Sequence, residues 1–322
     1  MKNVLITTLP FGKYDKSPIN LLKKNNINYY FNPKKKKFSR KELLKIIHNY
    51  DAIICGTDKI DGKIIKKAKK LKILSRIGIG LNNLDLKLLE KNQVKVTYTP
   101  EPPAQTVAEY VIGLMIYLLR NIEFSRKNFM MKKWNKIIGK DLKEAKIGIV
   151  GFGRIGSELV RLLKAFKCKD ILVNDVNIDK KILKKYSIKQ ATKNHIFKKC
   201  NLITFHVPLT KFTKNLVTKK EINLMSNDTI LINASRGGII NENDLYAALK
   251  NKKINSAALD VYSKEPYLGR LKKLKNCHCT THIASMSTSC RNKMEIESTK
   301  EVVRFFKGQK LKNEVPAGVY KK

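Results

Sequence analysis

Five polar residues in the second half of the chain have the types and positions needed for catalysis: His206, Arg236, Asp260, Glu265 and His282. Each follows a short apolar run within a few residues, and ligand-contacting residues of parallel sheets lie just past the carboxyl ends of strands. An enzyme that interconverts an alcohol and a carbonyl needs a proton carrier, usually histidine, and a cation for an anionic substrate. His282, Glu265 and Arg236 supply a proton carrier, a carboxylate to hold its tautomer and a cation. Taken singly, each would more often form a surface ion pair or a helix cap.

A glycine-rich segment in the middle of the chain predicts a dinucleotide site. It consists of an apolar run (147–150), the turn Gly151-Phe-Gly153-Arg-Ile-Gly156, a helix-period segment (155–166), a second apolar run (171–173) and Asp175. Gly151 would make the tight turn, Gly153 would let the backbone approach a pyrophosphate, and Gly156 would let helix and strand pack closely. The helix N-terminus would offer N–H groups to the phosphates. Asp175 would accept hydrogen bonds from ribose hydroxyls and repel a 2′-phosphate, so the pattern predicts NAD rather than NADP.

The elements that must position these residues follow from the alternation of apolar runs with helix-period segments, which predicts parallel sheets covered by helices. The expected strands, besides those of the glycine-rich segment, are 4–7, 27–31, 52–55, 73–75, 94–98, 202–205, 229–233, 257–259 and 277–280. The expected helices include one that opens at a capping box, Ser39 to Glu42, one from about 106 to 126, and one at 291–306. Some 145 residues precede the glycine turn in this chain of 322. That length predicts a separate domain before it.

The chain is strongly basic, with a formal net charge of +41, and 57 of its 67 basic residues are lysine. Lysine runs are spread along the whole length, at 34–37, 66–67, 69–70, 184–185 and 272–273. A nucleic acid or an anionic membrane is one interpretation of this charge. No stacking aromatics are interleaved with the lysines and no nucleic-acid motif is present, which favours a solvated surface without such a partner. In both cases the charge should speed encounter with anionic substrates and make rates sensitive to salt.

Six cysteines in a chain of this length are too sparse for a disulfide framework, which predicts a reducing compartment. Cys277-His-Cys279 with His282 suggests metal binding, but neighbours at i and i+2 lack the turn that zinc pairs usually use. We therefore predict no metal.

The longest apolar run, 110–119, is half of a membrane span. The expectation is a soluble, cytoplasmic protein.

Five segments, of which the glycine turn is the first, follow one another in order along the chain. They are Gly151-Phe-Gly-Arg-Ile-Gly156, His206-Val-Pro-Leu-Thr210, Asn233-Ala-Ser-Arg-Gly-Gly-Ile-Ile-Asn-Glu242, Leu259-Asp-Val-Tyr-Ser-Lys-Glu-Pro266 and Thr281-His-Ile-Ala284. Together with residues 76–80, Asp85 and 107–109, they resemble the D-isomer-specific 2-hydroxyacid dehydrogenases, and most closely the D-3-phosphoglycerate dehydrogenase branch. The resemblance covers nearly the whole chain.

The resemblance implies an α/β protein with two doubly wound parallel-sheet domains. A flavodoxin-like substrate domain would consist of residues 1–99 plus 284–322, and a Rossmann NAD-binding domain of residues 100–283. The active site would lie in the cleft between them, and closure of that cleft would exclude water around hydride transfer. The segment after Glu109, with Trp134 and Gly139, resembles the dimerisation region of the family, which implies a homodimer.

The resemblance also implies roles for individual residues. Arg236 would bind the carboxylate and the carbonyl oxygen of the substrate, His282 would exchange a proton with the C2 oxygen, and Glu265 would pair with His282. The implied substrate-binding loop, which would offer backbone N–H groups to the carboxylate, is Arg76, Ile77, Gly78, Ile79 and Gly80. The implied cofactor-binding residues are Gly151, Gly153, Arg154, Ile155, Gly156, Asp175, His206, Pro208, Ala234 and Asp260, the last of which would hold the nicotinamide carboxamide.

The implied activity is an NAD-dependent hydride transfer at C2 of a D-2-hydroxy acid. Our first expectation is oxidation of D-3-phosphoglycerate at the entry to serine synthesis, and the alternative is a hydroxypyruvate or glyoxylate reductase. An NADH-sensing regulator, as among the transcriptional corepressors of this fold, is an alternative of another class, against which the absence of an extended tail argues.

The chain departs from the family pattern at several positions. Thr281 and Ser285 stand where members often carry Pro and Gly, outside the proton-transfer chemistry. Pro103 stands where many carry an Asn near the substrate, which weakens the phosphoglycerate assignment. The chain also lacks the C-terminal regulatory domain of longer phosphoglycerate dehydrogenases, so feedback by serine is not expected.

Overall fold

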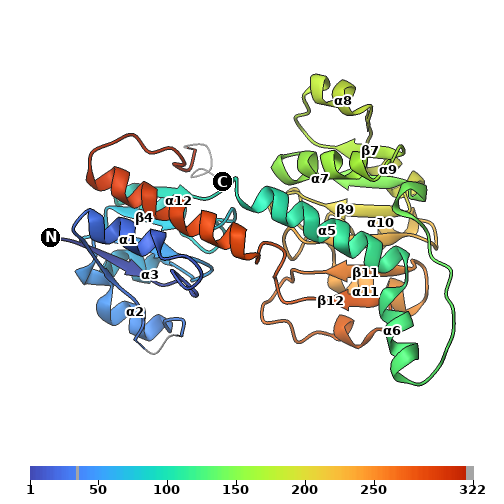
Figure 1. Cartoon of the computed structure of the whole chain (residues 1–322), viewed down its shortest axis with the longest axis horizontal. Coiled ribbons are helices and arrows are strands. Elements are labelled where there is room, and N and C mark those ends of the chain that lie inside the picture. Colours follow the sequence, from blue (N-terminus) through green and yellow to red (C-terminus); the bar gives the residue numbers. More distant parts are fainter. Residues whose placement is uncertain (34–35, 317–322) are drawn as a thin grey trace. The chain divides into compact units, whose positions relative to one another are not determined.

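Parallel strands alternate with helices along the chain and form two sheets, as Figure 1 shows for the computed structural model, which describes residues 1–33 and 36–316. The prediction of two doubly wound parallel-sheet domains is confirmed. The chain divides into unit 1, Met1–Pro103 with Met286–Lys322, and unit 2, Ala104–Ser285. The predicted domain boundaries follow residues 99 and 283. Lys34 and Lys35 of the expected basic run, and residues 317–322 of the expected substrate domain, lie outside the described residues.

The sheet of unit 1 has the strand order β2-β1-β3-β4-β5, which is the flavodoxin-like order. Its strands are β1 (Lys2–Ile6), β2 (Ile27–Tyr30), β3 (Ala52–Cys55), β4 (Ile73–Arg76) and β5 (Lys95–Tyr98). Its helices are α1 (Ser17–Lys24), α2 (Arg40–Ile46), α3 (Gly62–Lys67), α4 (Leu86–Lys91) and α12 (Thr288–Phe306), with a 3-10 turn at Ile47–Asn49. Successive β1 residues face opposite cores, since Leu5 packs with residues of α2 and α3 while Val4 and Ile6 pack with residues of α1 and α12.

Helix α12, near the C-terminus, belongs to unit 1 and packs beside α1, as Figure 1 shows in red and blue. A buried ion pair joins Arg291 Nε to Glu295 Oε1 at 2.6 Å, and Arg291 also donates to the Pro10 carbonyl. The other Glu295 oxygen accepts from the Gly12 N–H at 2.7 Å. The helix begins three residues before the predicted start because Ser287 caps it, accepting from the Cys290 N–H.

The sheet of unit 2 has the order β12-β11-β10-β9-β6-β7-β8, which is the Rossmann order with one more strand at the β12 edge. Its strands are β6 (Ile147–Val150), β7 (Ile171–Asn174), β8 (Lys189–Gln190), β9 (Leu202–Phe205), β10 (Ile230–Asn233), β11 (Ser256–Leu259) and β12 (Cys277–Cys279). Every residue of β6, β9, β10 and β11 is buried, because helices cover both faces of the sheet. Strand β8 was not predicted, because it has two exposed residues and no apolar run.

The helices of unit 2 are α5 (Pro103–Leu119, which begins at the last residue of unit 1), α6 (Ile122–Met130), α7 (Arg154–Ala165), α8 (Lys180–Tyr186), α9 (Lys193–Lys199), α10 (Lys219–Asn223) and α11 (Glu242–Lys250), with 3-10 turns at Leu142–Glu144 and Arg270–Lys273. The prediction of one helix over 106–126 is wrong. Asn121 takes a left-handed conformation with φ of 50°, which asparagine tolerates better than most residues, and this separates α5 from α6. Within the described part of the chain, no helix is both long enough and apolar enough to cross a membrane.

Candidate active site

The predicted site residues of unit 2 all lie at or just beyond the carboxyl ends of its parallel strands. The glycine turn follows β6, Asp175 follows β7, His206 and Pro208 follow β9, Ala234 and Arg236 follow β10, Asp260 and Glu265 follow β11, and His282 follows β12. Because the strands are parallel and adjacent in the sheet, these ends form one edge. The topology therefore gathers residues that are as much as 131 positions apart in the sequence.

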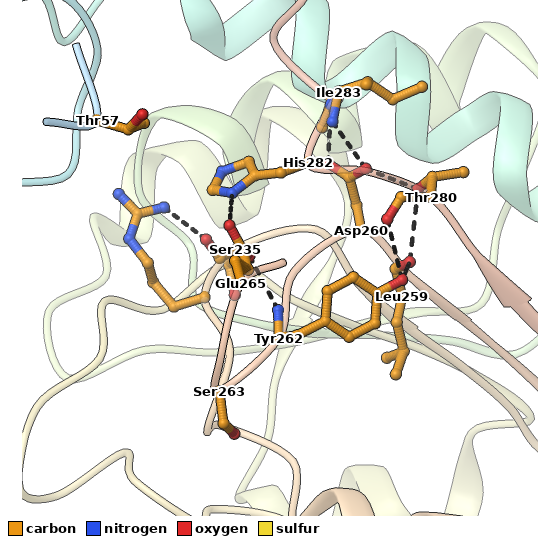
Figure 2. A network of polar contacts seen from close by, with 12 residues as sticks. Thr57, Ser235, Leu259, Asp260, Tyr262, Ser263, Glu265, Thr280, His282 and Ile283 are labelled. Atoms are coloured by element: carbon orange, nitrogen blue, oxygen red, sulfur yellow. Dashed lines mark hydrogen bonds and ion pairs between the residues drawn. The ribbon is translucent and has the colours of Figure 1, made fainter. Parts of the chain in front are cut away.

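His282 and Glu265 form a hydrogen-bonded pair at this edge (Figure 2). His282 Nδ1 lies 2.9 Å from Glu265 Oε2, and the second carboxylate oxygen accepts from the Tyr262 N–H at 3.1 Å. A carboxylate only accepts hydrogen bonds, so the pair assigns the ring proton to Nδ1 and leaves Nε2 for proton exchange. The two side chains are 40% and 38% exposed, which leaves the ring accessible to a small molecule.

The turn that carries His282 is held by Asp260, whose side chain is fully buried. One carboxylate oxygen accepts from the Thr280 hydroxyl at 2.6 Å and from the Ile283 N–H at 2.8 Å, and the other accepts from the Ala284 N–H at 2.8 Å (Figure 2). His282 itself has φ of 59°, a left-handed conformation that a turn must stabilise in a residue with a side chain. The predicted role of Asp260 was to hold the cofactor, and these hydrogen bonds to the His282 turn were not predicted.

Arg236 lies in a turn after β10 that Asn233 organises. The Asn233 amide donates to the Arg236 carbonyl at 2.9 Å, and its oxygen accepts from both the N–H and the hydroxyl of Ser235. The Arg236 guanidinium donates to the Ser235 carbonyl at 2.5 Å. Burial lowers the pKa of Arg236, and the Glu265 carboxylate acts in the opposite direction. Arginine keeps its proton in proteins, which makes Arg236 a cation at this edge.

Gly237 explains how this turn approaches the Glu265 loop. A Cβ at this position would lie 1.9 Å from the Tyr262 carbonyl carbon, so only glycine permits the backbones to come this close. Tyr262 in turn donates its N–H to Glu265. Arg236 and Glu265 are therefore brought together by a backbone contact that no spacing along the sequence reveals.

The glycine turn after β6 has the geometry that a dinucleotide requires. Gly151 has φ of 102°, and a Cβ there would lie 2.5 Å from the carbonyl carbon of His206. A Cβ on Gly156 would lie 2.2 Å from the Gly151 oxygen, whereas one on Gly153 would meet no atom within 4 Å. Gly153 is also the N-cap residue of α7, where no side chain caps the helix. The open space and the uncapped helix N-terminus fit an anionic pyrophosphate.

Two side chains beside the glycine turn complete this fit. Asp175 accepts from the Phe152 N–H at 2.6 Å and from the Val176 N–H at 2.7 Å, which fixes its carboxylate next to the turn. His206 Nε2 lies 3.1 Å from the Thr204 hydroxyl, and burial lowers the pKa of His206 to about 4, so its ring is neutral near pH 7. Its Nδ1 is buried and has no hydrogen-bond partner among the described residues. Such an atom is suited to a polar group of a bound molecule.

The loop of unit 1 predicted to bind a carboxylate is partly engaged with its own domain. The Ile77 N–H donates to the Cys55 carbonyl at 2.8 Å, and the Gly78 N–H donates to the Thr99 hydroxyl at 2.6 Å. The Arg76 guanidinium donates to the Ile77 carbonyl. Within residues 1–33 and 36–316, no partner is found for the N–H groups of Ile79 and Gly80. Of the backbone N–H groups predicted to bind a carboxylate, these two are therefore the candidates.

A lysine that sequence analysis did not single out lies at the same edge of unit 1. Lys37 Nζ donates to the hydroxyl of Thr57 at 2.8 Å, and Thr57 lies two residues after the end of β3. In the sheet, Cys55 of β3 pairs with Arg76 of β4, so both cations lie near neighbouring strand ends. Lys37 was not predicted as a site residue, because lysine is so abundant in this chain that no single one stands out.

Comparison with known proteins gives a consistent result. The family model described as "D-isomer specific 2-hydroxyacid dehydrogenase, NAD binding domain" matches residues 112–284. The chain is 33% identical over 282 residues to a D-3-phosphoglycerate dehydrogenase of Archaeoglobus fulgidus. The aligned region covers 86% of this chain but only 53% of that protein. It is 32% identical over 270 residues to a hydroxypyruvate reductase of Thermotoga maritima, which covers 82% of this chain and 87% of that protein.

The fold also matches solved structures. The D-lactate dehydrogenase of Lactobacillus jensenii, solved with NAD+, superposes with a TM-score of 0.78 at 23% sequence identity. The match covers 98% of this chain and 100% of that one. At this level of identity the likeness concerns the fold.

Proposed function

Because the chain belongs to the D-isomer-specific 2-hydroxyacid dehydrogenases and is an NAD-dependent oxidoreductase, we propose that its substrate is D-3-phosphoglycerate, oxidised at C2. This reaction would be the entry to serine synthesis. The observation that carries the choice is the pair of cations at the carboxyl edge of unit 1, Lys37 and Arg76, which suits a phosphate group in addition to a carboxylate.

The proposed catalytic roles follow from the geometry of unit 2. His282 Nε2 takes the proton from the C2 hydroxyl during oxidation and returns it in the reverse reaction, while Glu265 holds the proton on Nδ1. Arg236 binds the substrate carboxylate and the C2 oxygen through its planar fork. The NAD nicotinamide, when bound, supplies the hydride acceptor.

The cofactor would be held by the glycine turn and its neighbours. The proposed residues are Gly151, Gly153, Arg154, Ile155, Gly156, Asp175, His206, Pro208, Ala234 and Asp260. In unit 1, the N–H groups of Ile79 and Gly80 would receive the substrate carboxylate. Lys37 and Arg76 would receive the phosphate.

Reduction of hydroxypyruvate or glyoxylate is the second candidate function. Two points favour it: Pro103 at the start of α5 stands where the resemblance implies an asparagine in many members, and the Thermotoga relative is named a hydroxypyruvate reductase. Hydroxypyruvate differs from 3-phosphohydroxypyruvate only in the phosphate, whereas glyoxylate lacks both the phosphate and the carbon that carries it. The decision therefore depends on how much the protein gains from the phosphate.

The deciding experiment compares 3-phosphohydroxypyruvate with hydroxypyruvate as substrates of the purified protein, with NADH oxidation as the readout. These 2-keto acids differ only by the phosphate, and charge-assisted contacts with two cations should raise kcat/KM roughly 100-fold for the phosphorylated one. Measurements at two ionic strengths serve as a control, because non-specific attraction to the basic surface weakens with salt. A kcat/KM that favours hydroxypyruvate tenfold or more would reject the phosphoglycerate proposal.

We also propose that the protein is a homodimer that pairs through residues 122–138. This segment exposes large apolar side chains: Phe129 is 65% exposed, Met130 70%, Trp134 81% and Ile138 97%. Large apolar side chains that are exposed together in one segment often mark a protein interface. Sedimentation should give twice the chain mass of 36.9 kDa. Trp134→Asp should give a monomer, and Phe212→Asp, at an exposed phenylalanine elsewhere in unit 2, should not.

A further inference from the structure

Two of the six cysteines, Cys277 and Cys279, form a close pair on the edge strand β12. Residues at i and i+2 of a strand point to the same face, and the two sulfur atoms lie 3.8 Å apart. The remaining cysteines, Cys55, Cys168, Cys200 and Cys290, are buried and form no disulfide within the described residues. The pair is therefore the part of the described chain where two thiols can react with each other.

The two thiols of the pair differ in reactivity. The contact between the two thiols lowers the pKa of Cys279 to about 7 and raises the pKa of Cys277. Cys279 is also the more exposed of the two. By contrast, burial raises the pKa of Cys55 and of Cys200 to about 12. Since the thiolate is the reactive form, Cys279 is the nucleophile among these cysteines near neutral pH.

We propose that Cys277 and Cys279 are an oxidation site that reacts with hydrogen peroxide or an organic hydroperoxide and closes to an intrachain disulfide. The Cys279 thiolate attacks one peroxide oxygen, the O–O bond breaks, and a sulfenic acid forms with release of water or an alcohol. The Cys277 sulfur then attacks the Cys279 sulfur, the S–O bond breaks, and water leaves. Two thiols lose two electrons and two protons, and the peroxide gains them.

Closure of this disulfide would deform β12. The sulfur atoms must approach from 3.8 Å to about 2.05 Å, and neighbours at i and i+2 on an extended strand have Cα atoms about 6.6 Å apart, near the upper limit of about 6.8 Å for a disulfide. The strand can yield because it pairs with β11 on one side only. Oxidation therefore shortens or bends the strand locally.

The deformation reaches the residues of the candidate active site directly. Thr280 follows Cys279, its hydroxyl bonds Asp260 at 2.6 Å, and its carbonyl accepts from the Tyr262 hydroxyl at 3.0 Å. The same turn continues to His282. A shift at Thr280 disturbs the hydrogen bonds that place the histidine, so oxidation lowers turnover. This consequence, unlike the disulfide itself, rests on the proposed role of His282.

The first test locates the disulfide without using activity. The chain is oxidised with a small excess of hydrogen peroxide, unreacted thiols are blocked, and the tryptic peptide 276–291 is weighed. Cys290 lies in the same peptide, so the experiment is performed on Cys290→Ser as well as on the unmodified chain. The expected peptide has lost two hydrogens and regains them after treatment with dithiothreitol. Fully blocked Cys277 and Cys279 after exposure to peroxide would overturn the proposal.

Two variants separate the steps. In Cys277→Ser, Cys279 should be trapped by dimedone as a sulfenic acid and no disulfide should form. In Cys279→Ser, neither product should appear. A disulfide between other cysteines, or equal dimedone labelling in both variants, would contradict the assigned order. The mapping on the unmodified chain does not depend on whether either variant folds.

The second test measures turnover on whichever 2-keto acid the protein reduces. Oxidation should lower kcat roughly tenfold in the unmodified chain and in Cys290→Ser, dithiothreitol should restore it, and Cys279→Ser should be insensitive. A disulfide that forms with kcat unchanged would overturn the link to His282 while leaving the oxidation site standing. Failure of the proposed function itself would appear separately, as activity that survives removal of His282.

Discussion

The two parallel sheets present polar groups at their carboxyl edges in different ways. In unit 2 the groups bond each other: His282 pairs with Glu265 at 2.9 Å, and Asp260 binds three donors of the turn that carries the histidine. In unit 1 they bond the local backbone or a hydroxyl, as Arg76 does with the Ile77 carbonyl and Lys37 with Thr57. A network of mutually fixed groups suits a proton transfer, which needs defined geometry, whereas cations held by a local carbonyl or hydroxyl suit recognition of a charged substrate.

The strongest test of this comparison is the removal of the proton carrier. His282→Ala should lower kcat roughly 10³-fold, because general acid–base catalysis contributes this order of magnitude, while the dissociation constant for NADH stays within about twofold. Steady-state kinetics and fluorescence titration measure the two quantities. His195→Ala, at an exposed histidine on α9, is the matched control. Retained function together with retained NADH binding would instead favour an NADH-sensing protein.

A smaller loss is expected from Arg236→Lys. Lysine keeps the charge but not the planar fork that binds a carboxylate at two points, so kcat/KM should fall roughly 100-fold. Arg270→Lys, at an exposed arginine of unit 2 that lies over the Tyr246 ring, should change kcat/KM less than about twofold. If the two variants behave alike, charge alone accounts for Arg236 and the role of its fixed geometry is rejected.

On the side of unit 1, Lys37→Ala should change selectivity and leave the chemistry intact. Loss of one exposed cation should raise KM for the phosphorylated keto acid roughly tenfold and leave KM for hydroxypyruvate and both kcat values nearly unchanged. Lys36→Ala, the adjacent exposed lysine, serves as the control. An equal effect of the two variants would indicate a general effect of surface charge, and a fall in kcat would remove the distinction between the two edges.

The smallest effect concerns stability near the cofactor site. His206 has a pKa of about 4 in the folded protein, below the ordinary value of 6.5, so the unfolded chain takes up its proton first as the pH falls. Its contribution to stability is therefore complete above pH 6.5 and is lost progressively between pH 6.5 and about 4.

Between pH 7 and pH 5 the free energy of unfolding of the native chain should therefore fall by at most about 2 kcal/mol because of His206. His206→Gln should lack this part of the pH dependence. Urea unfolding at both pH values measures it, and the difference between the native chain and the variant cancels the carboxylates common to both. The same pH dependence in both proteins would show that His206 is not protonated on unfolding in this range.

Much of the fold was predictable because it depends on local patterns. Buried strands appear as apolar runs, which located β3 and β9 to the residue, and the capping box at Ser39 marks the start of α2. The errors have local causes too. Asn121 breaks a helix that its apolar neighbours would continue, and β8 has no buried residue to reveal it. Strand order was predictable only through resemblance to a known family.

The sequence by itself determined which chemical groups are available, that they follow strands, and that glycine stands where the backbone turns. Only the tertiary structure decided which groups meet. Glu265 and His282 are 17 residues apart, and their pairing depends on β11 and β12 being neighbours in the sheet. The tertiary structure also assigned Asp260 to the His282 turn. The physical reason is that hydrogen bonds between strands depend on distances of a few ångströms, which strand packing sets and spacing along the chain does not.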